Sequence, residues 1–163
     1  MKTIALRKAG VLAALMVAFV WSNAVRAEVK LPAVLNSHMV LQQGMPAPIW
    51  GWAEAGEKVT VSFAGQTKTT AADKDGKWQI KLDALKANAK GQSLTIAGTN
   101  KIELTDVLIG EVWICSGQSN MEWRITGALN PKEEVANSNH PQIRLFDVQG
   151  HVVNARPQEN CKG

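Results

Sequence analysis

Apolar and polar residues alternate in short runs between Leu31 and Thr105. The apolar residues of these runs are Val59, Val61 and Phe63; Trp78, Ile80 and Leu82; Leu94 and Ile96; Ile102 and Leu104. Alternation of period two places one set of side chains on a buried face and the other in water, as in an antiparallel sheet. Turn sequences such as Asp75-Gly76 separate the runs. The pattern therefore predicts an all-β sandwich domain over residues 28–105.

The pattern changes at Asp106. Residues 107–115 are almost continuously apolar, which is typical of a strand buried on both faces of a parallel α/β sheet. A small polar turn follows, then a helix start at Asn130-Pro131 and a strand-like run at 143–148. This order predicts a βαβ unit. Two strands cannot cover such a sheet, so we expect residues 106–163 to be the truncated start of an α/β domain.

Residues 1–27 have the pattern of a secretory signal peptide. Three basic residues precede an apolar stretch, and Val25 and Ala27 suit a cleavage after Ala27. The apolar stretch is shorter than the ~20 residues of a membrane-spanning helix. We therefore expect cleavage rather than a stable membrane anchor, and a mature protein that is secreted or periplasmic.

Composition and charge narrow the possible partners. Of the 163 residues, 45% are apolar and 20% charged, as in ordinary globular proteins. The net charge of +4 arises within residues 1–27, so the rest of the chain is neutral and gives no sign of nucleic-acid binding. Two cysteines and three histidines show no metal-binding spacing, and no metal or other cofactor is expected. Cys115 lies in the apolar run, where we expect a buried free thiol.

A candidate catalytic turn, Gly117-Gln118-Ser119-Asn120, follows the apolar run. Its serine stands between a predicted strand and a predicted helix, which would expose the hydroxyl at the carboxyl end of a sheet. Backbone N–H groups at the helix start would hold an oxyanion, and Gly117 would let a substrate approach closely. The alternative is a structural turn whose serine only caps the helix. The lipase pattern G-x-S-x-G does not fit, since Met121 replaces its second glycine.

The segment EVWICSGQSNME at 111–122 resembles the nucleophile block of the sialate O-acetylesterase family, a family of SGNH-type hydrolases with a flavodoxin-like α/β domain. Four upstream motifs resemble the same family in the same order. They are HMVLQQ at 38–43, PIWGWA at 48–53, DGKW at 75–78 and DVLIG at 106–110. The resemblance covers residues 31–150. It implies an enzyme that needs no metal or organic cofactor.

This resemblance implies that Ser119 is the nucleophile of a serine esterase acting on O-acetylated sugars, such as acetylated sialic acid, and that its backbone N–H contributes to the oxyanion hole. A histidine base and an aspartate that orients it would complete the site. The family supplies them in a later Asp-x-x-His motif, and neither His140 nor His151 stands in such a motif. We therefore expect the chain alone to be an inactive fragment. His38 is expected in a loop, without a catalytic role.

Several other side chains have two interpretations. Trp50 and Trp52 point to one side of a strand, where we expect sandwich core and where stacking on a sugar ring is the alternative. Trp113 and Trp123 flank the serine turn, and they either line a pocket or pack against the protein. Arg144 is expected to pair with a carboxylate. The alternative to an enzyme is a secreted, non-catalytic β-sandwich module that binds carbohydrate.

Overall fold

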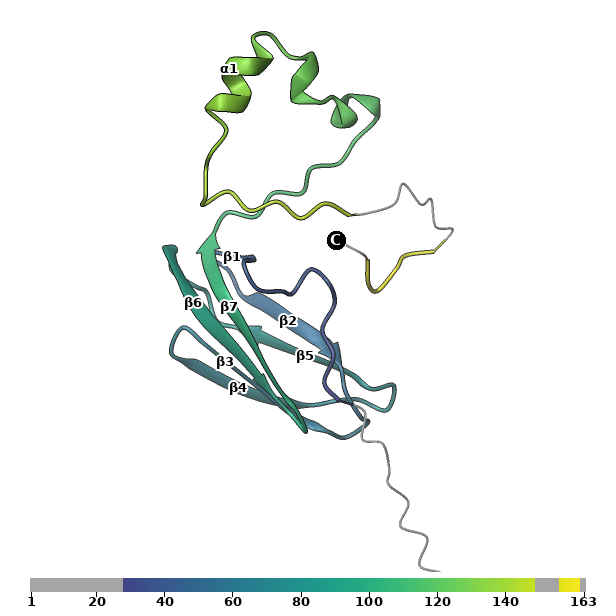
Figure 1. The fold of residues 1–163 in the computed structure, drawn as a ribbon. Helices are drawn as coiled ribbons and strands as arrows, with labels where there is room; N and C mark the ends of the chain where they lie inside the picture. Colours follow the sequence, from purple (N-terminus) through teal and green to yellow (C-terminus); the bar gives the residue numbers. More distant parts are fainter. Residues whose placement is uncertain (1–27, 149–155, 162–163) are drawn as a thin grey trace, which may run out of the picture.

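The computed structural model describes residues 28–148 and 156–161, and these are built mostly of β-strands (Figure 1). The predicted signal peptide and His151 lie outside the described residues. The strands are β1 (Val40–Gln42), β2 (Ala47–Trp52), β3 (Lys58–Phe63), β4 (Gln66–Ala71), β5 (Lys77–Leu82), β6 (Asn88–Ala97) and β7 (Lys101–Gly110). The mostly β architecture predicted from the alternating runs is confirmed.

The strands form two sheets. The larger has the order β1-β7-β6-β3-β4, and the smaller pairs β2 with β5. The short strand β1 runs parallel to β7, with Val40 opposite Leu108, whereas the other strand pairs are antiparallel. Strand β4 forms one edge of the larger sheet, and its polar sequence QTKTTA, with a central Lys68, disfavours pairing with another chain.

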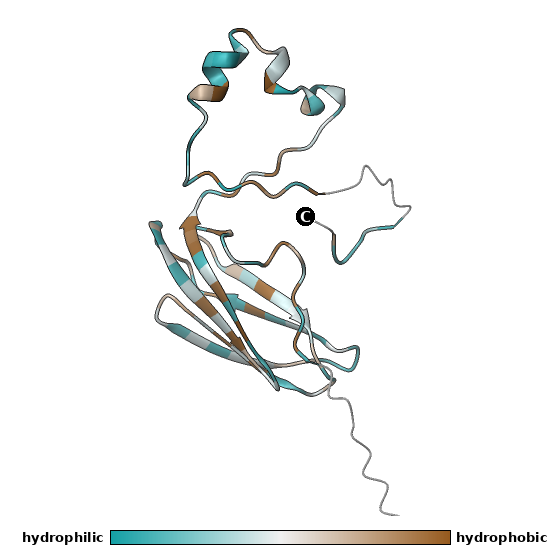
Figure 2. Cartoon of the chain, in the orientation of Figure 1, coloured by the Kyte–Doolittle hydropathy of each residue, from teal (hydrophilic) through white to brown (hydrophobic). Residues whose placement is uncertain are grey.

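Side chains from both sheets meet in one apolar core. Figure 2 shows the alternation of hydrophobic and hydrophilic residues along the strands that produces this core. Trp78, which the pattern places in the core, is 3% exposed, and this prediction is confirmed. The largest fully buried side chains are Ile49, Val59, Val61, Leu82, Leu94, Ile96 and Val107.

The predicted strand at 107–115 is wrong in its extent and in its partners. Residues 107–110 are the end of β7, which starts at Lys101 and therefore runs across the predicted boundary between residues 105 and 106. Strand β7 lies inside its sheet, between β1 and β6, and its residues 107–109 are buried without any α/β sheet. Residues 111–118 form no strand and are exposed. Cys115 is accordingly an exposed free thiol, not the buried one that we predicted.

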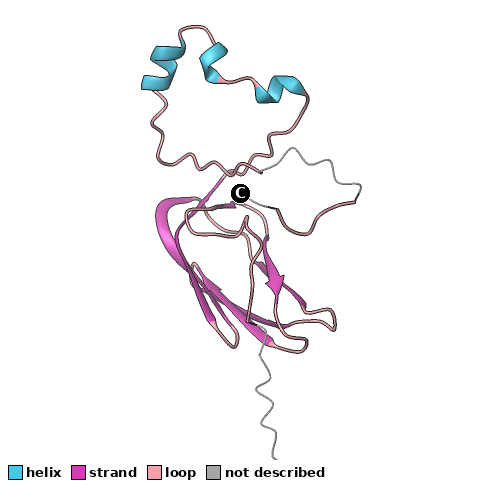
Figure 3. Ribbon diagram, turned by 45° about the vertical axis from the view of Figure 1, so that its right-hand side comes forward, coloured by secondary structure: helices cyan, strands magenta, loops and turns pink. Residues whose placement is uncertain are grey.

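The segment 111–148 lies outside the two sheets and holds the helices η1 (Ser119–Glu122), η2 (Ile125–Gly127) and α1 (Pro131–Ala136) (Figure 3). The predicted helix start at Pro131 is confirmed. The predicted strand at 143–148 does not form, because no strand of the described residues runs beside it. Many apolar side chains of this segment remain in water, and Leu145 is 92% exposed. No helix among the described residues is long and apolar enough to cross a membrane.

The structure also differs from the prediction that Trp50 and Trp52 belong to the sandwich core. Both are half-buried, and they alternate along β2 with Ile49 and Gly51, which are fully or nearly fully buried. The two tryptophans therefore lie on the face of the small sheet that points away from the core. Trp50 still packs against the edge of the core.

Candidate functional site

The candidate catalytic turn forms a short 3-10 helix on an exposed segment. Ser119 begins η1, and all four residues of this helix are exposed. Gly117 lies against a side chain of its own turn, and the approach of a substrate to its backbone stays a prediction. A Cβ atom at Gly117 would lie 2.7 Å from Cγ of Met121, so only glycine leaves room for the methionine side chain. The Met121 N–H donates to the Gln118 carbonyl oxygen at 2.8 Å and closes the turn.

The residues that flank this turn do not enclose it. Trp113 and Trp123 are 82% and 71% exposed. The indole of Trp123 lies against its own segment, since a Cβ atom at Gly127 would approach Nε1 of Trp123 to 2.8 Å. Within residues 28–148 and 156–161, no side chain makes a hydrogen bond to the Ser119 hydroxyl. The described residues therefore present the serine without an assembled acid–base partner.

A second polar cluster stands where β7 is irregular. Asp106 has a φ of 55° and His38 a φ of 67°, both in the left-handed region that non-glycine residues rarely adopt. Oδ2 of Asp106 lies 2.7 Å from Nδ1 of His38 and accepts a hydrogen bond from Nη1 of Arg144 at 2.7 Å. These hydrogen bonds, first from Arg144 and then from His38, hold the pKa of the Asp106 carboxyl below its usual range. The expected pairing of Arg144 with a carboxylate is confirmed.

No local pattern predicts that Asp106 gathers His38 and Arg144 around its carboxylate, because a lone aspartate in a strand pattern has no such signature. The strand opposite carries an indirect signal. A Cβ atom at Gly91 of β6 would lie 2.2 Å from Oδ1 of Asp106, so the irregularity needs a glycine beside it. The cluster has a histidine beside a carboxylate, as a serine esterase does, but its carboxylate is shared with Arg144 and it contacts no serine hydroxyl among the described residues.

The parallel pairing of β1 with β7 joins two of the motifs that carry the family resemblance. The end of HMVLQQ meets the residues that follow DVLIG. Gln42 and Gln43 donate from their Nε2 atoms to the Glu111 carboxylate, at 3.0 and 2.6 Å. These two hydrogen bonds lower the pKa of Glu111. Oε1 of Gln42 accepts from the Val112 N–H at 2.8 Å. Together they fix the direction in which the chain leaves the sheet toward Ser119.

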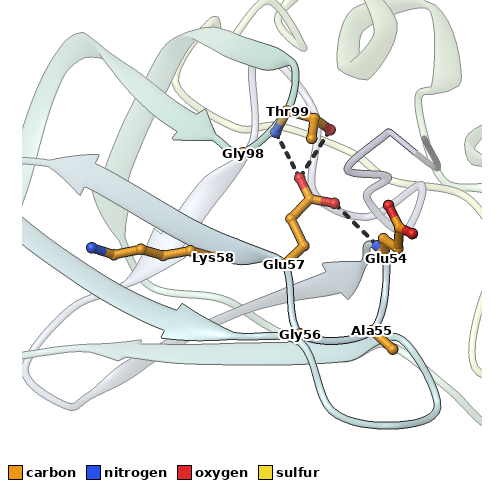
Figure 4. Close-up of a pocket in the computed structure, with 7 residues that line it drawn as sticks. All are labelled: Glu54, Ala55, Gly56, Glu57, Lys58, Gly98 and Thr99. Atoms are coloured by element: carbon orange, nitrogen blue, oxygen red, sulfur yellow. Dashed lines mark hydrogen bonds between the residues drawn. The ribbon is translucent and has the colours of Figure 1, made fainter. Parts of the chain in front are cut away.

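A third polar site is a depression of about 710 Å³ between two turns (Figure 4). The Glu57 carboxylate accepts hydrogen bonds from the N–H of Thr99 at 2.6 Å, from the Thr99 hydroxyl at 3.0 Å and from the N–H of Glu54 at 3.1 Å. It thus ties the turn before β3 to the turn between β6 and β7. This carboxylate holds the two turns together, and both of its oxygens already accept hydrogen bonds.

Metal chemistry has no candidate site in the part of the chain that the structure describes. No three side chains of His, Cys, Asp or Glu gather there closely enough to hold a metal ion. The thiols of Cys115 and Cys161 are both free. The Ser119 turn thus remains the candidate for chemistry, and the Asp106 cluster and the Glu111 hydrogen bonds position the segment that carries it.

Comparisons with known proteins agree on one relationship. No protein-family model matches the chain. The sialate O-acetylesterases of Rattus norvegicus and Homo sapiens are each 31% identical to it over an alignment of 131 residues, and the alignment covers 73% of this chain. A crystal structure of a carbohydrate acetylesterase from Xanthomonas citri is 36% identical, with a TM-score of 0.77 over 83% of this chain.

The match covers only part of each relative. It takes in 24% and 25% of the two curated proteins and 31% of the crystallised chain, so this chain spans about a quarter of the length of the curated relatives. Within that span, the sequence identity and the similarity of the backbone point to the same family. On these grounds the chain belongs to the sialate O-acetylesterase family.

Proposed function

We propose that this chain supplies the nucleophile of a serine esterase that removes acetyl groups from sugars, and that Ser119 is this nucleophile. The observation that carries the proposal is the 36% identity and TM-score of 0.77 to a carbohydrate acetylesterase over 83% of the chain. The family resemblance around Ser119 and its exposed position on η1 support the assignment. The sialate O-acetylesterases that match the chain point to an acetylated sugar as substrate.

The proposed mechanism is acyl transfer. A histidine takes the proton of the Ser119 hydroxyl as its Oγ atom attacks the carbonyl carbon of the acetyl ester. The tetrahedral oxyanion is held by backbone N–H groups, and the sugar oxygen leaves with the proton from the histidine. Water, deprotonated by the same histidine, then hydrolyses the acetyl-enzyme and frees acetate. An aspartate orients the histidine throughout.

The base and the aspartate are proposed to come from outside the described residues. A serine hydroxyl is a weak nucleophile without a positioned base, and no described side chain is bonded to that of Ser119. We therefore propose that residues 28–163 alone are inactive as an esterase. Hydrolysis of p-nitrophenyl acetate by these residues should equal that of their Ser119→Ala variant, and a faster wild-type rate would contradict this part of the proposal.

The nucleophile is tested in a protein that joins this chain to the remaining catalytic blocks of the family. Ser119→Ala should lower turnover of an acetylated sugar by about three orders of magnitude or more, because triad members act as a unit. Ser116→Ala is the matched control in the same turn and should keep turnover within about tenfold of wild type. A fluorophosphonate probe should label Ser119. Normal turnover in the Ser119→Ala variant would refute the assignment.

The site of action is proposed to be the periplasm or the exterior of the cell. The proposal rests on the signal-peptide pattern of residues 1–27. Mass spectrometry of the exported protein should find Glu28 as its first residue, and an exported protein that retains Met1 would contradict it.

A further inference from the structure

The outer face of the small sheet carries an aromatic pair that the esterase proposal does not use. Trp50 and Trp52 of β2 are half-buried and point away from the core, because Ile49 and Gly51 occupy the inward positions. The inward side at Gly51 has no free space, since a Cβ atom there would lie 2.1 Å from the carbonyl oxygen of Lys30. The face of β2 that carries Ile49 and Gly51 must therefore point inward, and both indoles are held on the outer face.

Polar side chains of β5 stand directly beside these indoles. The register places Gln79 opposite Trp50 and Lys77 opposite Trp52. Both polar residues are exposed, and they alternate with the buried residues of β5. Within the described part of the chain, the amide of Gln79 makes no hydrogen bond, and neither do the indole nitrogens of Trp50 and Trp52. The face thus offers flat apolar rings next to free donors and acceptors.

The segment 156–161 forms a second wall beside this face. An open groove of about 630 Å³ is lined by Trp50, Trp52 and Gln79, and also by Glu159 of the segment 156–161. An ion pair between Lys77 and Glu159 holds that segment beside the sheet. Its neighbour, Asn160, accepts a hydrogen bond from the N–H of Ala33 at 2.9 Å.

We propose that this groove binds the pyranose rings of a β-linked oligosaccharide. Equatorial hydroxyls leave the axial C–H groups of such a ring as an apolar face, which stacks on an indole, while its hydroxyls reach the polar rim. Side chains two positions apart on one strand face are about 7 Å apart, so the two indoles offer two neighbouring stacking positions along the groove. Gln79 and Lys77 supply hydrogen-bond donors at the rim.

The charge of the groove argues against the other polymers that stack on tryptophan. Asp73 and Glu159 line it. Lys77 lines it too, but its charge is paired with Glu159, so the groove has no excess of positive charge, which a single-stranded nucleic acid needs. An apolar peptide or a membrane surface would leave the polar groups at the rim without partners. A neutral sugar chain satisfies both the rings and the rim, and its binding does not depend on the chemistry of Ser119.

Isothermal titration calorimetry with non-acetylated probes tests this proposal. Cellohexaose and xylohexaose represent neutral β-linked chains, and sialyllactose represents an acidic sugar. Wild-type residues 28–163 should bind at least one neutral probe with a dissociation constant in the millimolar range or below. Trp52→Ala should weaken binding at least tenfold, and Gln79→Ala about threefold or more.

Separate controls test whether each variant is folded and whether the probes bind at the groove. Trp50 packs against the core, so Trp52→Ala and Gln79→Ala are the informative variants, and unchanged circular dichroism and melting temperature show that each is folded. Trp113→Ala and Trp123→Ala, both exposed tryptophans on the segment outside the sheets, should bind the probes as wild type does. This outcome would hold even if the esterase assignment fails.

Three results would overturn the proposal. The first is no binding of either neutral probe by the folded wild-type chain at millimolar concentration. The second is undiminished binding by Trp52→Ala and Gln79→Ala. The third is binding of sialyllactose alone, lost on Lys77→Ala but kept in Trp52→Ala, which would show recognition of a carboxylate rather than stacking of a ring.

Discussion

Two substitutions of the same chemistry, Leu94→Ala and Leu145→Ala, distinguish the core from the segment outside the sheets. Leu94 is fully buried in β6, opposite Leu104, whereas Leu145 is 92% exposed. Each change removes three carbon atoms. At about 0.8 kcal/mol per buried methylene, the lost burial at position 94 is worth about 2.4 kcal/mol. The cavity left in the closed core raises the total cost to about 3–4 kcal/mol.

The side chain of Leu145 is already exposed to water, so truncating it removes almost no buried surface. We expect Leu145→Ala to change the free energy of unfolding by less than about 0.5 kcal/mol, as for surface substitutions in general. Urea denaturation followed by tryptophan fluorescence measures both values. In thermal unfolding, Leu94→Ala should lower the melting temperature by about 12 °C or more, because 1 kcal/mol corresponds to about 4–8 °C in a domain of this size.

Equal costs at the two positions would refute this reasoning, since they would mean that residues 111–148 pack into a core of their own. A cost below about 1 kcal/mol at Leu94 would refute it in the other direction, because it would show that the two sheets do not close over that side chain.

Two further predictions concern the irregularity in β7. Gly91→Ala should destabilise the protein by about 1–3 kcal/mol in urea denaturation, because its Cβ would lie 2.2 Å from Oδ1 of Asp106. The control Gly110→Ala should cost much less, since the atom nearest to its Cβ would be 3.5 Å away. Equal costs of the two substitutions would contradict the close contact at Gly91. The contact of Asp106 with Arg144 should be intact above the ordinary carboxyl pKa of about 3.9 and be lost only as the pH falls through the lowered folded-state value. NMR titration of the carboxyl carbon should show this lowered value, and an ordinary value would refute the ion pair.

The repeating pattern was sufficient to predict the elements that depend on local alternation. Strands β3 and β5 and the core position of Trp78 follow directly, because an apolar residue at every second position buries one face of a strand whatever its neighbours are. The start of α1 at Pro131 is similarly local, because proline at the first helical position loses no hydrogen bond. The family also follows from short motifs, since each is a contiguous run of residues.

Strand partners and the choice of inward face were decided only by the tertiary structure. The apolar run after Asp106 was equally consistent with a new α/β sheet, and its first residues instead complete β7, because β1 and β6 are available to pair on either side. Along β2, alternation separates two faces but does not tell which one is inward. The two tryptophans point outward because the carbonyl oxygen of Lys30 leaves room only for a glycine at position 51. That contact joins residues distant in the chain, and no local pattern encodes it.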